Sequence, residues 1–225
     1  MPEVPNARKE LKAMMPAAFS QRAWARNLPL YEAIRDMPFN RELRDGGLAI
    51  ERFRHYIVQD AHYLIGFGQA LALAAAKADH PDHIVQFARG AETAIVVERE
   101  LHAAYFRRFD IGPEHFAATA PSPTCHHYVS FLLATGFREP LPVHLAALLP
   151  CFWVYRKVGR HIHAHAGAEN TYRAWIDAYA GAEFAAAVDA MIATTEARMH
   201  AVFTRATQLE WMFWDSAYRQ ETWPA

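Results

Sequence analysis

Apolar side chains recur at helical spacing along most of this chain. Between Leu48 and Ala78 they fall three and four positions apart, which predicts one long helix with a buried stripe. After Asp79-His80-Pro81 the same spacing predicts a second long helix that ends near Phe109. The segment Arg44-Asp45-Gly46-Gly47 precedes the first of these helices and is typical of a helix stop.

The helical period returns after a loop that is predicted between Ile111 and Pro123. Thr124 is expected to cap the helix that follows this loop. The stretch 145–155 reads LAALLPCFWVY and is apolar almost throughout. It predicts a core helix that either is kinked by Pro150 or begins there, because proline cannot donate a backbone hydrogen bond.

The C-terminal part of the chain is also predicted to be helical. A short helix is expected over 170–179, Gly181 should end it, and 182–214 should form two further helices. No segment shows the alternation of apolar and polar residues that strands require. The fold class predicted is all-α, a single-domain helical bundle of roughly seven or eight helices.

Residues 1–22 are predicted to be an N-terminal leader ahead of one helical domain at 23–225. A short helical pattern runs from Ala7 to Met15 and stops at Pro16. The leader is charged and punctuated by proline, and it lacks the apolar core of a signal peptide. We expect it to be a surface or interface segment.

Three residues with reactive or charged groups fall on faces that are otherwise apolar. Asp60 lies within the stripe of the first long helix, and Glu210 lies within the stripe of the last helix. Cys151 shares a face with Tyr155, one turn away. A buried carboxylate costs several kcal/mol unless it is paired or hydrogen-bonded, so each acid needs a structural or a functional reason.

Both kinds of reason remain open from the sequence pattern alone. Cys151 could be a small buried hydrophobe, as free cysteines often are. Asp60 could form a structural pair with a core arginine, histidine or tyrosine. Alternatively, Asp60, Cys151 and Glu210 line one pocket between helices, where a thiol offers nucleophilic catalysis and a desolvated glutamate offers general acid–base catalysis.

The amino-acid composition excludes some classes of partner and indicates a cellular compartment. The chain has 23 basic and 24 acidic residues and a net charge of −1, so nucleic acid is not a natural partner. The two cysteines form no disulfide framework, which suits a reducing cytoplasm. The longest apolar run, 64–76, is shorter than the roughly 20 residues of a membrane span, so no membrane partner is expected.

No metal site and no cofactor are predicted. Glu98 and His102 are one turn apart, but we expect a helix-stabilising pair, since their spacing differs from that of di-iron bundle ligands. His161 and His165 share a helical face from which His163 points away, so these histidines do not predict a three-ligand site. They are better explained as cations favoured at a helix C-terminus.

Five segments together resemble the TenA family, the thiaminase II type of aminopyrimidine hydrolase. They are FRHYIVQDAHYL (53–64), PSPTCHHY (121–128), LAALLPCFWVYRKVG (145–159), TYRAWIDAY (171–179) and EWMFWDSAY (210–218). The resemblance covers about residues 35 to 220 in the family's order. It implies a haem-oxygenase-like helical bundle and the branch of the family that has a catalytic cysteine.

The resemblance also implies a role for each matching residue. Cys151 would be the nucleophile that adds to a pyrimidine ring, and Asp60 would bind the exocyclic amino group and a ring nitrogen. Glu210 would protonate the other ring nitrogen. Four tyrosines match the family's pocket tyrosines: Tyr63, Tyr128, Tyr155 and Tyr172.

The function expected from the resemblance is hydrolysis of a small-molecule aminopyrimidine. The substrate would be 4-amino-5-aminomethyl-2-methylpyrimidine or thiamin, and the product would be the hydroxymethylpyrimidine. A homo-oligomer, tetramer or dimer, is implied as well. The sequence departs from the family's pattern in two places. The leader is longer than expected, which bears on assembly, and Cys125-His126-His127 differs from the usual residues there, which bears on pocket shape.

Two other functions remain as alternatives. One is an oxidase of the same fold that resembles the quinone-cofactor synthases, which should show inward histidine or carboxylate ligand sets. The other is a non-catalytic module that binds a pyrimidine or haem, which would bind its ligand without turnover. Function belongs to the site and not to the fold.

Overall fold

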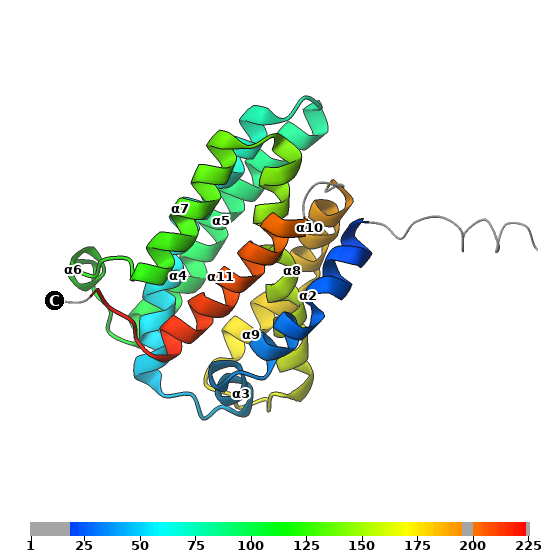
Figure 1. Cartoon of the computed structure of the whole chain (residues 1–225). Helices are drawn as coiled ribbons and strands as arrows, with labels where there is room; N and C mark the ends of the chain where they lie inside the picture. The colour runs from blue at the N-terminus through cyan, green and yellow to red at the C-terminus, as the bar shows by residue number, and fades with distance from the viewer. Residues whose placement is uncertain (1–18, 195–199, 224–225) are drawn as a thin grey trace, which may run out of the picture.

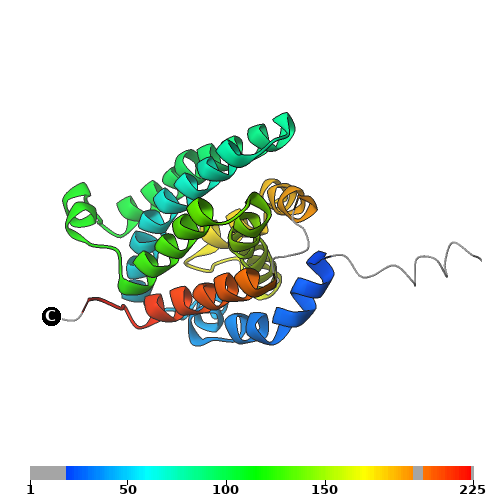
Figure 2. The same cartoon turned by 45° about the horizontal axis from the view of Figure 1, so that its top comes forward.

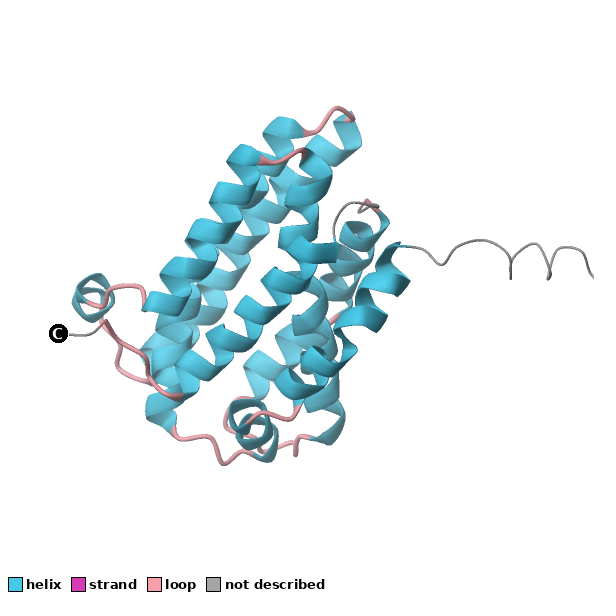
Figure 3. Ribbon diagram, viewed as in Figure 1, coloured by secondary structure: helices cyan, strands magenta, loops and turns pink. Residues whose placement is uncertain are grey.

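The computed structural model describes residues 19–194 and 200–223, with only the backbone for 97–101, 200 and 201. Within these residues every element of regular structure is a helix and no strand occurs (Figure 3). The helices are α2 (Phe19–Arg35), α3 (Pro38–Asp45), α4 (Ile50–Lys77), α5 (Pro81–Arg108), α6 (Pro113–Ala118), α7 (Pro123–Arg138), α8 (Leu141–His165), α9 (Arg173–Ala180), α10 (Ala182–Ala193) and α11 (His200–Tyr218). The all-α prediction is confirmed.

The long helices form the body of the bundle (Figure 1). α4 packs against α5 and α7, while α8 packs against α11, α9 and α10. α2 packs against α11 and α8, and the turned view shows it on the opposite side of the bundle from α5 (Figure 2). The core therefore lies between α4, α8 and α11, the three helices that carry Asp60, Cys151 and Glu210.

Helix boundaries lie close to the glycine and proline residues that predicted them. α4 and α5 begin and end within a few residues of the predicted limits. α3 ends where Gly46 adopts a left-handed conformation, with φ 76°, which a residue with a Cβ would adopt less readily. The backbone N–H of Gly47 then donates to the carbonyl of Glu42 at 2.9 Å, which satisfies an open carbonyl at this helix end.

The loop predicted before α7 differs from the structure in two respects. It contains the short helix α6, because Pro113 fits the first turn of a helix. The N-cap of α7 is Ser122 and not Thr124, since Pro123 occupies the first helical position. The Ser122 hydroxyl accepts from the backbone N–H of Cys125 at 3.2 Å, while the Thr124 hydroxyl donates to Glu221 at 2.6 Å.

The number of helices also exceeds the predicted seven or eight. Among the described residues there are ten, because α3 and α6 were not expected as separate helices. α2 begins at Phe19, inside the predicted 1–22 leader, and buries Phe19 and Ala23. The predicted helical pattern at 7–15 lies outside the described residues. Within the described part of the chain, no helix has the length and apolar character needed to cross a bilayer.

Candidate active site

A cavity of about 1070 Å³ runs into the bundle between α4, α5, α8, α9 and α10. Four of the residues predicted from the sequence line it: Asp60, Tyr63, Cys151 and Tyr155. The rest of the lining is mostly apolar, with Leu64, Phe67 and Phe152 near these residues in the chain. An apolar pocket with a few convergent polar groups is the usual form of a small-molecule site.

Asp60 is 2% exposed and has a buried partner. Its Oδ2 lies 3.0 Å from Nε2 of His102 on α5, which is itself 5% exposed. A carboxylate can only accept, so Nε2 of His102 donates when Asp60 is ionised. Among the described residues Oδ1 of Asp60 makes no hydrogen bond, so one carboxylate oxygen is held in place and the other is available to a ligand.

This pairing gives His102 a partner that the sequence did not predict. The described partner is Asp60, on another helix, whereas the sequence predicted a helix-stabilising pair with Glu98. The side chain of Glu98 lies outside the described residues. Asp60 thus has the structural partner that the sequence left open, and it also lines the cavity.

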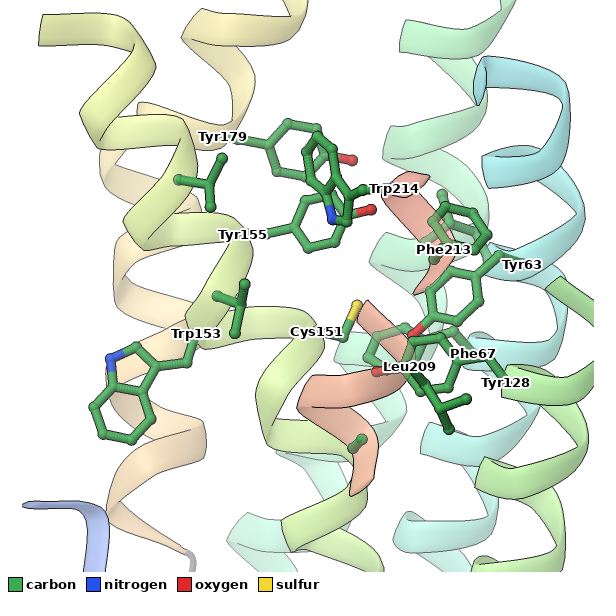
Figure 4. Close-up of a cluster of buried hydrophobic side chains, with 14 of the residues drawn as sticks. Tyr63, Phe67, Tyr128, Cys151, Trp153, Tyr155, Tyr179, Leu209, Phe213 and Trp214 are labelled. Atoms are coloured by element: carbon green, nitrogen blue, oxygen red, sulfur yellow. The ribbon is translucent and has the colours of Figure 1, made fainter. Parts of the chain in front are cut away.

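Cys151 lies on the cavity wall one residue after Pro150, inside α8. Its sulfur points into the space between Tyr155 and Tyr63 (Figure 4). Burial raises the pKa of Tyr63 well above its usual value, and the nearby Cys151 raises it further. The Tyr63 hydroxyl is buried and makes no hydrogen bond of ordinary geometry within the described residues, and the Cys151 side chain is one of the groups with which it interacts.

Glu210 is 1% exposed and does not reach the cavity wall. Its Oε1 accepts a 2.7 Å hydrogen bond from the hydroxyl of Tyr128 on α7. Burial raises the pKa of Glu210 to about 8, the Tyr128 hydrogen bond opposes this rise, and Asp60 adds to it. A carboxyl group with this pKa holds a proton near neutrality and can give it up, as a general acid must.

Tyr128 connects Glu210 to the cavity. Its ring lies 5.0 Å from the ring of Tyr63, which is part of the cavity wall. Glu210 also raises the pKa of Tyr63 and Tyr155, so its carboxyl group belongs to the same electrostatic cluster. Glu210 is therefore one side chain removed from the space in which Cys151 lies.

Tyr155 lines the cavity within a group of aromatic rings. Its ring lies 5.0 Å from Trp214 and 5.2 Å from Tyr179, as the upper part of Figure 4 shows. Its hydroxyl is 3.5 Å from the hydroxyl of Tyr56. These flat faces suit the stacking of an aromatic ring.

Tyr172 does not line the cavity, which departs from the sequence prediction. Its hydroxyl donates to the backbone carbonyl of Leu48 at 2.6 Å, and its ring packs 4.3 Å from Phe53. In this part of the chain the tyrosine that lines the cavity is Tyr179, seven positions later and within α9. Gly159 on α8 permits this, since a Cβ there would lie 2.9 Å from the Cβ of Tyr179.

The second cysteine and the histidine clusters lie outside the site. Cys125 is fully buried, does not line the cavity, and has its pKa raised to about 12 by burial. His163 pairs with Arg173 and Asp177, while the rings of His161 and His165 lie 4.6 Å apart. In the described ranges no three or more histidine, cysteine or acidic side chains are arranged to hold a metal ion.

Comparison with known protein families shows which family this chain matches. The model of the TENA/THI-4/PQQC family matches residues 24–220, which include every residue of the candidate site. The chain belongs to the TENA/THI-4/PQQC family. The resemblance to TenA proteins noted from the sequence motifs is thereby confirmed.

Two relatives of this chain are named for aminopyrimidine hydrolysis or thiamine biosynthesis. An aminopyrimidine aminohydrolase of Halalkalibacterium halodurans is 30% identical over 219 residues, which cover 92% of this chain and 98% of the relative. The thiamine biosynthesis multifunctional protein ThiED of Corynebacterium efficiens is 36% identical over 188 residues, or 83% of this chain. The match spans only 25% of that multifunctional protein.

The fold agrees with that of a solved TenA homologue. The structure from P. horikoshii OT3 superposes with a TM-score of 0.84 at 25% identity, covering 91% of this chain and 100% of the other. The helical bundle of this chain therefore has the fold of a TenA homologue.

Proposed function

We propose that this TenA-family protein is a cysteine-dependent aminopyrimidine aminohydrolase. It would convert 4-amino-5-aminomethyl-2-methylpyrimidine, or thiamin, into 4-amino-5-hydroxymethyl-2-methylpyrimidine. The observation that carries the proposal is the arrangement of the Cys151 thiol on a cavity wall with Asp60, backed by Glu210 with a pKa near 8. The names of the relatives support the substrate class.

The pyrimidine ring is held by its polar edge and by its faces. Oδ1 of Asp60 accepts from the exocyclic amino group, and His102 keeps the carboxylate fixed through Oδ2. The rings of Tyr155 and Tyr179 supply stacking surfaces beside Cys151. This pose presents the ring carbon to the sulfur and leaves the substituted methylene pointing along the cavity.

Catalysis begins with protonation of a ring nitrogen. Glu210 supplies this proton, and catalytic contacts of this kind often tighten only when substrate is bound. The protonated ring accepts electrons, so the Cys151 thiolate forms a carbon–sulfur bond to it. Tyr63 is the cavity residue placed to interact with the thiol during this step.

Formation of the carbon–sulfur bond allows the group on the methylene carbon to leave. The carbon–nitrogen bond breaks, the amine leaves with its electron pair and takes up a proton, and water adds to the methylene carbon. The carbon–sulfur bond then breaks, Glu210 recovers its proton and the thiolate is restored. The balance is one water consumed and one amine released, with no oxidation or reduction.

The assembly expected from the resemblance and the cytoplasmic location expected from the cysteine content remain part of the proposal. A homo-oligomer, tetramer or dimer, is supported by apolar side chains at the surface, notably Phe137 at 73% exposure and Val96 at 50%. Light scattering of the full chain measures the oligomer directly.

One experiment tests the proposed activity. The full chain is incubated separately with the aminomethylpyrimidine and with thiamin, and products are followed by mass spectrometry, with Cys151→Ser as the control. Hydroxymethylpyrimidine formed from either substrate by the native chain, and not by the variant, supports the proposal. Binding of the pyrimidine without turnover would favour a binding module, and oxidised products would favour an oxidase.

A further inference from the structure

The chain turns back after α11 and runs to the loop that precedes α7 (Figure 1). We call residues 219–223 the C-terminal strap. Gln220 has φ 51°, in the left-handed region that residues with a Cβ adopt uncommonly. Its backbone N–H donates to the carbonyl of Ala217 at 3.1 Å, and the N–H of Glu221 donates to that of Ser216 at 2.8 Å. This is the hydrogen-bond pattern of a Schellman helix ending, which reverses the chain and directs Glu221 toward α7.

The strap is attached to the first turn of α7. Oε2 of Glu221 accepts two hydrogen bonds from Thr124, one from its backbone N–H at 3.0 Å and one from its hydroxyl at 2.6 Å. The first N–H groups of a helix have no partner within it, and a carboxylate there is also favoured by the helix dipole. The indole Nε1 of Trp223 donates to the carbonyl of Pro121 at 3.0 Å. Glu221 is thus a cap of α7 that is supplied by the end of α11.

α7 is held to the C-terminal segment at a second point, one turn further on. Thr124 and Tyr128 are four positions apart and share a face of α7. Thr124 bonds to Glu221, and the Tyr128 hydroxyl donates to Oε1 of Glu210 at 2.7 Å. Both Thr124 and Tyr128 are almost completely buried. Two contacts on one face fix the position of α7 along α11 and its rotation about its own axis.

The start of α7 is attached separately to α4. Oε1 of Gln59 accepts from the backbone N–H of Ser122 at 2.7 Å, and its Nε2 donates to the carbonyl of Ala120 at 3.2 Å. Gln59 directly precedes Asp60, whose carboxylate is held by His102. Loss of the strap should therefore change the contact between α7 and α11 and leave Asp60 in place.

We propose that Glu221 is a positioning residue, which keeps the Tyr128 hydroxyl on the carboxyl group of Glu210. It acts through Thr124 and does not line the cavity. The inference rests on the proposed aminohydrolase function, in which Glu210 supplies the proton. It assigns a part in that proton transfer to a residue that does not touch the substrate.

The charged groups around the two acids separate positioning from a direct effect of charge. The ionisable side chains coupled to Glu210 are Asp60 and Tyr63 on α4, Tyr128 on α7 and Tyr155 on α8. Those near Glu221 are Arg219, at 3.7 Å, and His55 on α4. Among the described residues these two sets share no member. Removal of a nearby negative charge lowers the pKa of a carboxyl group, whereas loss of the Tyr128 hydrogen bond raises that of Glu210.

The test uses three variants of the full chain. Glu221→Ala removes both hydrogen bonds to Thr124, and Glu221→Gln keeps an oxygen that can accept them. Glu42→Ala is the matched control, because the Glu42 carboxylate accepts from the Tyr218 hydroxyl at 2.8 Å and so joins α11 to α3 instead of α7. Thermal melts establish that each variant retains the fold.

Infrared spectroscopy follows the carboxyl band of Glu210 between pH 6 and 10, with the band assigned by its loss in Glu210→Gln. We expect Glu221→Ala to raise the titration midpoint by about half a pH unit to one pH unit, the size of one hydrogen bond. Glu221→Gln and Glu42→Ala should titrate as the native chain does. In a Tyr128→Phe background Glu221→Ala should cause no further shift. An unchanged or lowered midpoint in Glu221→Ala, or an equal rise in Glu42→Ala, would overturn the inference.

Turnover gives a second readout. We expect Glu221→Ala to lower kcat by about tenfold, because a small displacement of a reacting group is costly, while product affinity changes by less than about twofold. A matching loss of product affinity would assign Glu221 to the fold as a whole and overturn the inference.

Failure of the inference and failure of the proposed function give different results. If the native chain hydrolyses the aminomethylpyrimidine but the midpoint of Glu210 does not move in Glu221→Ala, only the inference is overturned. If the native chain hydrolyses neither the aminomethylpyrimidine nor thiamin while the midpoint moves as expected, the proposed function is overturned and the positioning of Glu210 by Glu221 is supported.

Discussion

Nε2 of His102 and Oδ2 of Asp60 are 3.0 Å apart, and both side chains are almost completely buried. The pair joins α5 to α4 at the inner end of the cavity. Because removing one partner leaves the other as an unpaired buried polar group, this contact affects both stability and the orientation of Asp60. We therefore expect His102 to act as a positioning residue for the proposed substrate.

Replacing His102 tests this role. His102→Leu removes the donor, and we expect it to weaken binding of the hydroxymethylpyrimidine product by about three- to tenfold, a fraction of a charge-assisted hydrogen bond. His102→Gln keeps an N–H donor and should retain most of the affinity. Isothermal titration calorimetry measures both variants.

A double-mutant cycle separates positioning from general damage to the fold. Asp60→Asn alone should weaken product binding by about 1.5–3 kcal/mol, because the charge that holds the amino group is lost. If His102 works through Asp60, His102→Leu should have little further effect in the Asp60→Asn background. Fully additive losses would assign His102 to the fold alone.

The two cysteines should differ sharply in reactivity. Cys151→Ser should lower turnover by several orders of magnitude, since the nucleophile is lost, while Cys125→Ser should retain most activity. Cys125 is fully buried with a pKa raised to about 12, so it has almost no thiolate at neutral pH. Iodoacetamide labelling followed by peptide mass spectrometry should find Cys151 modified first, and the pyrimidine product should slow that reaction. Equal labelling of both cysteines would contradict the assignment.

The sequence indicated three candidate residues of the site because helical periodicity reveals a charged or reactive side chain on an otherwise apolar face. Asp60, Cys151 and Glu210 each interrupt such a face, and the structure brings their helices together. Periodicity does not encode how one helix is rotated against another. The contact between Asp60 and His102, which lie 42 residues apart in the chain, could not be found in that way.

The same limit explains why the sequence pattern does not distinguish Tyr172 from Tyr179 as the tyrosine that lines the cavity. Tyr172 and Tyr179 are seven positions apart, so a helical pattern puts them on one face. Their separation in the structure depends on where α9 begins: Tyr172 is the residue before it and Tyr179 lies within it. The sequence contained one signal for this contact, namely Gly159 in an otherwise bulky helix, because a glycine there often marks a close approach of another element. In the structure that element is α9, at Tyr179.

The Tyr128 hydroxyl should tune the pKa of Glu210. Its hydrogen bond lowers that pKa against the effect of burial, so Tyr128→Phe should raise it above the native value of about 8. The alkaline limb of the kcat–pH profile should then move to higher pH. Tyr218→Phe is a matched control, because the Tyr218 hydroxyl also donates to a glutamate, Glu42, at 2.8 Å, and neither residue lines the cavity. An unshifted limb in Tyr128→Phe would mean that Glu210 does not control it.

Ionisation of Glu210 should make the free energy of unfolding depend on pH. Its pKa is about 8 in the folded chain and 4.5 in the usual reference state, so the folded state binds more protons between these values. The free energy of unfolding should therefore fall as pH rises from about 4.5 to about 8, by the linkage between proton binding and folding. Glu210→Gln cannot ionise, so its melting temperature relative to the native chain should increase over this range. Glu32→Gln, at an exposed position on α2, should show no such trend.

The same substitution tests the catalytic proton. Glu210→Gln keeps the size of the side chain but cannot give up and recover a proton, so turnover should fall by about 10²–10⁴-fold, the usual contribution of a general acid–base group. Product affinity should change little, because Asp60 and the aromatic rings supply the binding contacts. The native rate should decline above about pH 8 as Glu210 loses its proton, although ionisation of Cys151 acts in the opposite direction. Stopped assays of product formation between pH 6 and 10 measure both effects. A variant that retains near-native turnover while showing the stability trend would make Glu210 a buried structural acid and require another proton donor.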